Sequence, residues 1–141
     1  MILEIKDKKV ISDTRMEKAR EFLTDARATY EQKRFRTSVN RAYYAALNAV
    51  RAILILEGAN PETHDGAVTL LSLRFVKTGV LSVDVIKKFN VLLSRRTDVD
   101  YGDFDTTGPM EAEDSLRNSE EIVQMIDSAR RKIIAELENS P

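Results

Sequence analysis

The sequence predicts an all-α fold, an antiparallel up-and-down helical bundle of about five helices. Apolar residues recur at alternating steps of three and four along most of the chain, which is the spacing of one helix face. Only the N-terminal tail, residues 1–11, shows a pattern that competes as a strand. A chain of 141 residues with 43% hydrophobic and 32% charged residues suits one domain, so we expect a single domain over residues 1–141. Helix should exceed about 65% of the residues, against an average of about one third.

The first helix is expected to begin near Ser12. The segment 12–14, Ser-Asp-Thr, followed by Glu17, has the pattern of an N-cap with a capping box. The apolar face of this helix follows at helical spacing: Met16, Ala19, Leu23, Ala26 and Tyr30. The charged segment 33–36 ends the helix and leaves residues 1–11 outside it as a tail.

The second helix, over residues 37–57, is predicted to be the central one. Gly58 marks its end, because glycine closes a helix in the left-handed conformation at little cost. Apolar residues and alanines cover most of its sides, which predicts burial among other helices. A polar stripe interrupts this surface at steps of three, four and three: Arg41, Tyr44, Asn48 and Arg51. Buried polar groups need partners, so this stripe is a candidate site.

Two further helices are predicted from residues that are typical of helix ends and helix starts. A short third helix over residues 65–77 should stop at Gly79. A last helix of about 28 residues should begin at Pro109, because proline is favoured in the first turn of a helix. The turn before the third helix contains His64, for which a role at the helix start is the simpler explanation and ligand binding the alternative.

A fourth helix, after Ser82, contains the most informative anomaly. Val85, Phe89 and Leu92 form an apolar stripe, and Arg96 occupies the next position of that stripe. An arginine is rarely buried without a partner. Arg96 could pair with Asp100 four residues later along the helix, or it could belong to a site or a dimer contact.

The composition argues against several classes of protein. Lysine plus arginine (22) nearly balances aspartate plus glutamate (23), so the chain lacks the basic excess of a dedicated duplex-DNA binder. It has no cysteine and one histidine, and we expect no metal site and no cofactor. The first ten residues are too charged for a signal peptide, and no stretch resembles a membrane span. A cytoplasmic protein without a membrane partner is therefore expected.

Four motifs occur in order along residues 13–130 and resemble one branch of a known family. They are Asn40-Arg-Ala-Tyr-Tyr-Ala-Ala46, Pro61-Glu-Thr-His-Asp-Gly66, Phe75-Val-Lys-Thr-Gly79 and Arg96-Thr-Asp-Val-Asp-Tyr-Gly-Asp-Phe104. Together they resemble the prokaryotic HEPN (higher eukaryotes and prokaryotes nucleotide-binding) domains. That resemblance implies an antiparallel helical bundle, often dimeric and often encoded beside a minimal nucleotidyltransferase as toxin and antitoxin.

The resemblance also implies a site. Ribonuclease members carry an arginine followed four to six residues later by a histidine, and two such motifs face each other across the dimer. In this chain Tyr101 stands where the histidine would follow Arg96. A histidine exchanges protons at neutral pH, whereas a tyrosine hydroxyl rarely does, so it is uncertain whether the chain is an enzyme. If it cleaves RNA without metal, the resemblance assigns phosphate stabilisation to Arg96 and substrate orientation to Asp100 and Tyr101.

Three functional hypotheses follow. The first is a nucleotide- or RNA-associated component of a toxin–antitoxin type module, with a metal-independent ribonuclease activity as its strongest form. The second is a non-catalytic partner subunit of a minimal nucleotidyltransferase, and the third is a purely structural interaction bundle. The candidate nucleotide- or RNA-binding residues are Arg41, Tyr44, Asn48, Arg51 and His64.

Two structural expectations accompany these hypotheses. The chain should form a homodimer in which the second and fourth helices line the interface. Arg96, Asp100 and Tyr101 should meet Arg41 or Tyr44 in one net basic cleft, because the second helix presents the inward polar stripe.

Overall fold

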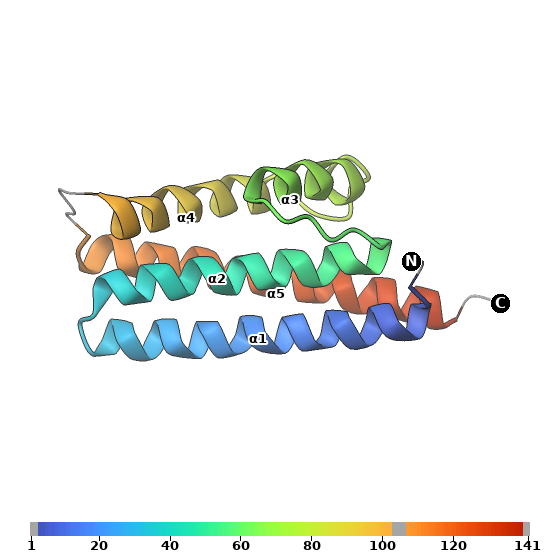
Figure 1. The fold of residues 1–141 in the computed structure, drawn as a ribbon, viewed down its shortest axis with the longest axis horizontal. Coiled ribbons are helices and arrows are strands. Elements are labelled where there is room, and N and C mark those ends of the chain that lie inside the picture. Colours follow the sequence, from blue (N-terminus) through green and yellow to red (C-terminus); the bar gives the residue numbers. More distant parts are fainter. Residues whose placement is uncertain (1–2, 103–106, 140–141) are drawn as a thin grey trace.

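The computed structural model describes residues 3–102 and 107–139, and Figure 1 shows its arrangement of helices. Helices make up 83% of these residues, and no strand occurs among them. The long helices α1, α2, α4 and α5 lie side by side in alternating directions, with α3 shorter and at one side (Figure 1). The bounds are α1 Ile5–Glu31, α2 Phe35–Leu54, α3 His64–Leu71, α4 Asp84–Tyr101 and α5 Pro109–Glu138. The predicted all-α, antiparallel bundle of five helices is confirmed.

The predicted start of the first helix is wrong. Helix α1 begins at Ile5, after Glu4 in an extended conformation, and most of the supposed tail is helical. Asp7 in the first turn favours this start, because a carboxylate stabilises the positive end of the helix dipole. Ser12 is not a cap: its side chain is fully buried, and its hydroxyl donates a 2.6 Å hydrogen bond to the carbonyl oxygen of Ala52.

Helix α2 lies at the centre of the bundle, as expected. Its buried residues are Ser38, Val39, Ala42, Tyr43, Ala45, Ala46, Ala49, Val50, Ala52, Ile53 and Leu54. After α2 a single turn of 3₁₀ helix, Ile55–Glu57, leads to Gly58 with a φ of 77°, which confirms the predicted stop. Small residues let the neighbouring helices approach closely enough for hydroxyl groups to reach their backbones. Ser38 donates to the carbonyl of Ala26 in α1, and Ser119 of α5 donates to that of Ala42.

The third helix is less regular than predicted. Helix α3 continues into a π-helical segment, Ser72–Val76, and the chain turns at Gly79 with a φ of 81°. Leu71 and Phe75 are buried under it. A π segment widens the helix by one residue per turn and is frequent near functional sites.

Helix α4 buries the stripe that its sequence predicts. Val85, Phe89 and Leu92 are fully buried against the other helices. Arg96 follows on the same face, and its side chain is 19% exposed. The stripe therefore carries this arginine to the edge of the core.

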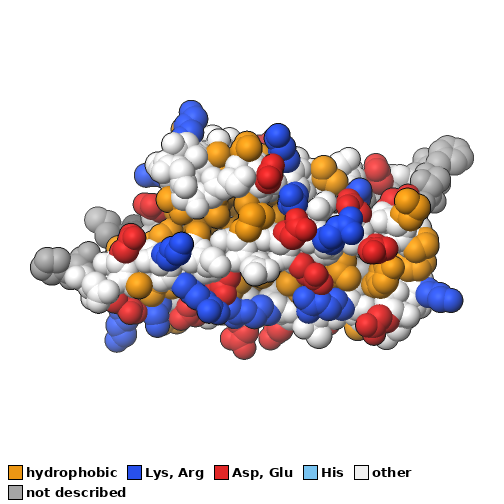
Figure 2. Space-filling view, turned by 180° about the vertical axis from the view of Figure 1, so that it is seen from behind, with side chains coloured by type: hydrophobic (Ala, Val, Ile, Leu, Met, Phe, Trp, Pro, Cys, Tyr) orange, Lys and Arg blue, Asp and Glu red, His pale blue; other side chains and the backbone are white. Residues whose placement is uncertain are grey.

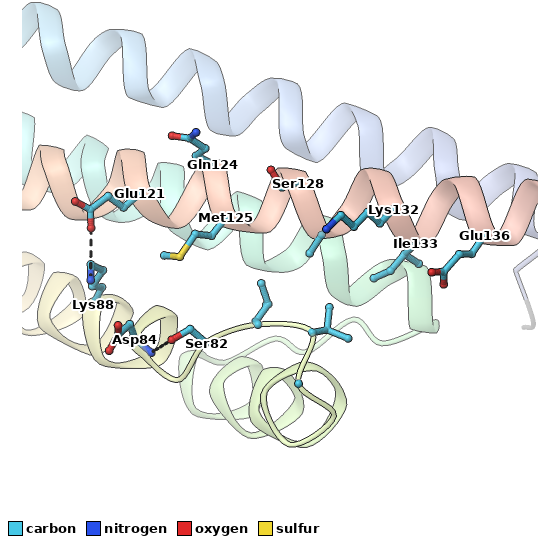
Figure 3. A pocket seen from close by; sticks show the side chains of 14 residues that line it. Ser82, Asp84, Lys88, Glu121, Gln124, Met125, Ser128, Lys132, Ile133 and Glu136 are labelled. Atoms are coloured by element: carbon cyan, nitrogen blue, oxygen red, sulfur yellow. Dashed lines mark hydrogen bonds and ion pairs between the residues drawn. The ribbon is translucent and has the colours of Figure 1, made fainter.

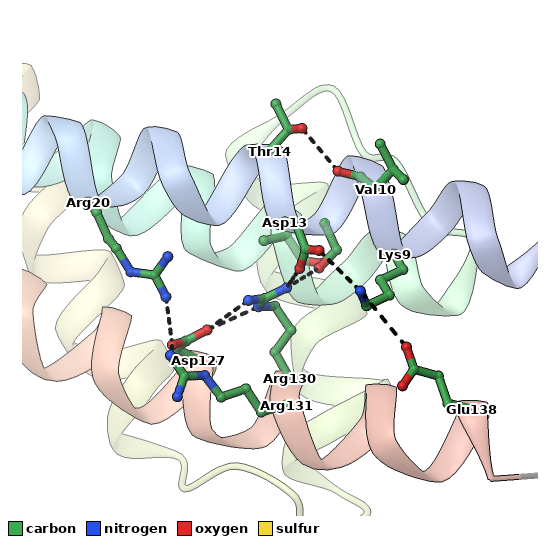
Figure 4. A network of polar contacts seen from close by, with 11 residues as sticks. Lys9, Val10, Asp13, Thr14, Arg20, Asp127, Arg130, Arg131 and Glu138 are labelled. Carbon is green, nitrogen blue, oxygen red and sulfur yellow. Dashed lines mark hydrogen bonds and ion pairs between the residues drawn. The ribbon is translucent and has the colours of Figure 1, made fainter.

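A polar network joins α1 to α5 at the opposite side of the bundle (Figure 4). Arg130 is 5% exposed, and its guanidinium lies 2.6 Å from a carboxylate oxygen of Asp13 and 3.0 Å from one of Asp127. Its Nη1 also donates to the hydroxyl of Ser12 at 3.3 Å, and Arg20 of α1 pairs with Asp127 at 2.9 Å. These paired charges fix how the first and last helices lie against each other.

Candidate functional site

A cleft of about 250 Å³ opens between α2, α4 and the segment that leads into α3. Tyr43, Tyr44 and Arg51 line its α2 side, Arg96 lines its α4 side, and His64 lies at the start of α3. The polar stripe of α2 and the anomalous position of α4 therefore face each other. We name this site the arginine cleft.

Arg96 is held by the two tyrosines of α2. Its Nη1 donates a 2.9 Å hydrogen bond to the hydroxyl of Tyr44, which confirms the expected meeting of these residues. The guanidinium carbon lies 5.0 Å from the centre of the Tyr43 ring and 5.7 Å from that of Tyr44. Asp100 forms an ion pair with Arg96 along α4, as the simpler explanation expected, but its carboxylate oxygen is 3.7 Å from Nε and so beyond hydrogen-bond distance. Burial opposes the charge of Arg96, but the Tyr44 hydrogen bond and the Asp100 carboxylate raise its pKa, so it stays cationic.

Arg51 has no such partner within the described residues. Its guanidinium makes no hydrogen bond or ion pair there, and its Nε atom is buried. The Nε atom of Arg96 is likewise buried without a hydrogen-bond acceptor. A buried donor without an acceptor costs about 1–3 kcal/mol, so a ligand oxygen that accepts a hydrogen bond from either group would recover part of that cost.

His64 connects the start of α3 to both other walls. Its Nδ1 lies 3.0 Å from the hydroxyl of Tyr43, and its Nε2 lies 3.0 Å from the side-chain oxygen of Asn90 in α4. The amide oxygen only accepts, so Nε2 carries the proton and the hydroxyl of Tyr43 donates to Nδ1. Burial raises the pKa of Tyr43, which keeps this hydroxyl protonated. The imidazole ring also packs 4.3 Å from the ring of Phe89.

The position of His64 at the helix start agrees with the sequence. Thr63 caps α3, and its side-chain oxygen accepts a hydrogen bond from the backbone of Gly66. The bonds to Tyr43 and Asn90 could not be anticipated, because they depend on how α3 packs against two other helices. No sequence signal singled out Asn90.

Tyr101 does not join the arginine cleft. Its side chain is 74% exposed at the last position of α4. Five residues along a helix rotate the side-chain direction by about 140°, so Tyr101 cannot share the face of Arg96. The expected meeting of Tyr101 with Tyr44 was therefore wrong. The end of the motif at Phe104 lies outside the described residues.

The other two predicted binding residues also lie outside the cleft. Arg41 stacks over the ring of Phe22 at 5.6 Å and lines a neighbouring hollow with Asp100. The side-chain nitrogen of Asn48 donates to the carbonyl of Tyr44 within the same helix, at 2.8 Å. The α2 stripe is thus divided between two hollows instead of forming one site.

A larger hollow, about 760 Å³, lies elsewhere, between α5, the start of α4 and the connection 79–82 (Figure 3). Met125 and Ile133 contribute apolar surface, and Lys88 pairs with Glu121 at 3.4 Å. On this face of the molecule, lysine and arginine side chains mix with aspartate and glutamate (Figure 2). None of the predicted site residues lines this hollow. Because it offers no buried donor without a partner, we place the candidate site in the smaller arginine cleft.

Neither a metal-binding cluster nor a membrane-spanning helix occurs in the part of the chain that the structure describes. No group of three or more histidine, aspartate or glutamate side chains is placed to hold a metal ion there. None of the helices there is long and apolar enough to cross a membrane.

The chain belongs to the HEPN domain family, whose sequence profile matches residues 12–132. A UPF0332 protein of Thermotoga maritima is 30% identical over 123 residues, covering 87% of this chain and 90% of that protein. A Methanocaldococcus jannaschii protein named "Putative toxin" is 30% identical over 119 residues, covering 84% and 88%. A crystal structure of a Thermus thermophilus protein matches with a TM-score of 0.72 and 18% identity, over 84% of this chain and 97% of that one, which shows the shared fold.

Proposed function

We propose that this HEPN domain is the nucleotide- or RNA-binding member of a toxin–antitoxin type module, with phosphate bound in the arginine cleft. The observation that carries the proposal is the pair of buried guanidinium donors on Arg51 and Arg96 that have no acceptor and line one cleft. The relative named as a toxin supports the module to which we assign it.

The chemistry of the cleft suits a nucleotide. Guanidinium groups bind phosphate oxygens through two parallel hydrogen bonds. Arg51 has no carboxylate partner among the described residues, and Arg96 keeps Nε without a hydrogen-bond acceptor although Asp100 lies 3.7 Å away, so a phosphate oxygen would meet unsatisfied donors on both arginines. The rings of Tyr43 and Tyr44 and the side chain of Leu47 add surface on which a base can pack.

Binding is better supported than cleavage. Metal-independent cleavage needs a group that exchanges a proton, and His64 is the side chain of that kind in the cleft. Both nitrogens of His64 are already engaged, by Tyr43 and Asn90. We therefore assign phosphate binding to Arg96 and Arg51, and we propose that Asp100 and the exposed Tyr101 orient RNA outside the cleft.

The test is equilibrium binding of fluorescent single-stranded RNA and of adenosine monophosphate. Arg96→Ala should weaken both by at least about tenfold, the loss of one charged hydrogen-bonding group, while the protein still unfolds cooperatively. Arg131→Ala is the matched control, because Arg131 is 70% exposed and does not line the arginine cleft. Wild-type protein that binds neither ligand, or Arg96→Ala protein that binds both unchanged, refutes the proposal.

Cleavage is tested separately, by incubating RNA with protein and a metal chelator. Tyr101→His places a histidine five residues after Arg96, as in the ribonuclease members of the family. Cleavage by this variant together with an inert wild type would identify the chain as a nuclease that has lost its proton-transfer group. Cleavage by the wild type would instead restore the enzyme hypothesis.

A partner-subunit role is the second candidate, and apolar side chains on the surface favour it. Val83 and Val91 of the α4 region are 48% and 41% exposed. Most apolar residues of α2, in contrast, are buried within the protomer, so a homodimer or a nucleotidyltransferase complex would use α4. Light scattering that returns one particle of 16.0 kDa, alone and after mixing with a nucleotidyltransferase encoded beside this gene, would exclude both assemblies.

A further inference from the structure

We infer that Arg15, held beside Arg51, forms a second phosphate subsite next to the arginine cleft, so that the ligand is a single strand with at least two nucleotides. This inference rests on the proposed function, because it extends the same site along α2. It adds Arg15, a residue of α1 that stands in none of the family motifs.

Arg15 reaches the end of α2 and is held there by neutral groups. Its Nη1 donates to the backbone carbonyl of Arg51 at 3.2 Å, and its Nη2 donates to the side-chain oxygen of Asn60 at 3.0 Å. The Arg15 guanidinium of α1 is thus held at the backbone of Arg51 in α2. Neither makes an ion pair with a carboxylate in the described part of the chain.

This pairing is unfavourable without an anion. Partial burial and the charge of Arg51 both lower the pKa of Arg15, so the Arg15 cation is destabilised by its surroundings. Lys8 adds a third positive charge at this end of the bundle, where its amine lies beside Gly58. Glu62 lines the adjoining cleft but lies beyond ion-pair distance of Arg51.

Many other arginines of the bundle, in contrast, are paired with carboxylates. Each of the following has a carboxylate oxygen within 4.0 Å: Arg20, Arg27, Arg95, Arg117, Arg130 and Arg131. Neither Arg15 nor Arg51 has a carboxylate oxygen within this distance among the described residues, although the two lie close enough for their charges to interact. A bound phosphate would supply the missing negative charge.

The spacing of the two subsites selects the ligand. Arg96 is bonded to the hydroxyl of Tyr44, whereas Arg15 is bonded to the backbone of Arg51, which lies two helical turns, about 10 Å, further along α2. The two phosphorus atoms of a diphosphate are much closer together than that. Phosphates on separate nucleotides of an extended strand can reach both subsites.

The test compares adenosine monophosphate, adenosine diphosphate and oligoadenylate RNAs of two, four and eight nucleotides. For the wild type, affinity should rise from the monophosphate to the four-nucleotide strand by about tenfold or more, and the diphosphate should gain little. Arg15→Gln should remove most of that gain and leave monophosphate binding unchanged. The dependence of log K on log salt should fall by about 0.7, the value for one phosphate contact on a single strand.

Two further variants serve as controls, one for the loss of an arginine from α1 and one for a loss of folding. Arg20→Gln alters an arginine of the same helix that is ion-paired and 49% exposed, and it should bind every ligand as the wild type does. Arg15→Lys keeps the charge and should restore most of the salt dependence, which a loss of folding would not allow.

The outcomes separate the two proposals. If Arg96→Ala abolishes binding but Arg15→Gln binds the four-nucleotide strand normally, the second subsite is refuted and the arginine cleft stands. If Arg15→Gln weakens monophosphate and strand equally, or if the diphosphate gains as much as the strand, the assignment to separate nucleotides is refuted. If no ligand binds the wild type, the proposed function itself fails.

Discussion

Replacing Arg130 by methionine tests how much the polar network between α1 and α5 contributes to stability. The guanidinium is 5% exposed and contacts Asp13, Asp127 and Ser12. Removing one partner of a buried ion pair costs about 3–5 kcal/mol when the other charge is left alone. Here Asp127 keeps Arg20, and Asp13 is 48% exposed, so we expect a loss of about 2–3 kcal/mol.

This loss should appear as a lower melting temperature. For 141 residues the entropy of unfolding is about 0.3 kcal/mol per kelvin, so the melting temperature should fall by roughly 7–10 °C. Urea unfolding followed by circular dichroism gives the free energy directly, and the slope should be unchanged. Arg131→Met is the control, because Arg131 pairs with the same Asp127 but is 70% exposed. It should cost less than about 0.5 kcal/mol. Equal losses in the two variants would refute the reasoning, since burial would then be irrelevant.

Three further predictions concern single side chains. The hydrogen bond from Arg95 lowers the pKa of Asp114 in the folded protein. The ionised carboxylate therefore stabilises the fold at pH values above its unfolded pKa, and this stabilisation is lost as the pH falls through the folded pKa. Because the carboxylate is 35% exposed, Asp114→Asn should cost below about 1 kcal/mol at neutral pH and nothing near pH 2, as urea titrations at both pH values would show. Gly58→Ala should destabilise by about 1–2 kcal/mol, because its φ of 77° strains any side chain; a neutral effect in the same assay would contradict this. Phe89→Ala should cost about 3–5 kcal/mol, as its fully buried ring leaves a cavity, and a loss under 1 kcal/mol would mean that the core collapses around it.

The helices were largely predictable because local rules determine them. Periodic apolar residues, Gly58 and Pro109 each act within a few residues of their own position, and the structure uses them as expected. Ser12 shows the limit of such rules. The segment Ser-Asp-Thr followed by Glu17 has the pattern of a cap, but the hydroxyl of Ser12 donates instead to the carbonyl of Ala52, forty residues along the chain. A pattern read from neighbouring residues cannot reveal a partner that distant.

The same limit applies to the candidate site. Arg96 was found because it breaks an apolar stripe, which is a local signal, and its bond to Tyr44 follows from two facing helices. Arg15 carried no signal, because a single arginine on a charged helix is ordinary. What makes it unusual is the approach of Arg51, which only the packing of α1 against α2 produces.

The central place of α2 has a practical consequence for finding the ligand. Residues that would hold the phosphates stand on α1, α2 and α4, so a bound ligand would tie together three helices that must separate during unfolding. A ligand that binds only the folded chain, at one hundred times its dissociation constant, adds about 2.7 kcal/mol to the free energy of unfolding. For a chain of this length that corresponds to a rise in melting temperature of roughly 9 °C. The ligand can therefore be sought by measuring the melting temperature with different nucleotides and oligonucleotides, without any label and without knowledge of the reaction.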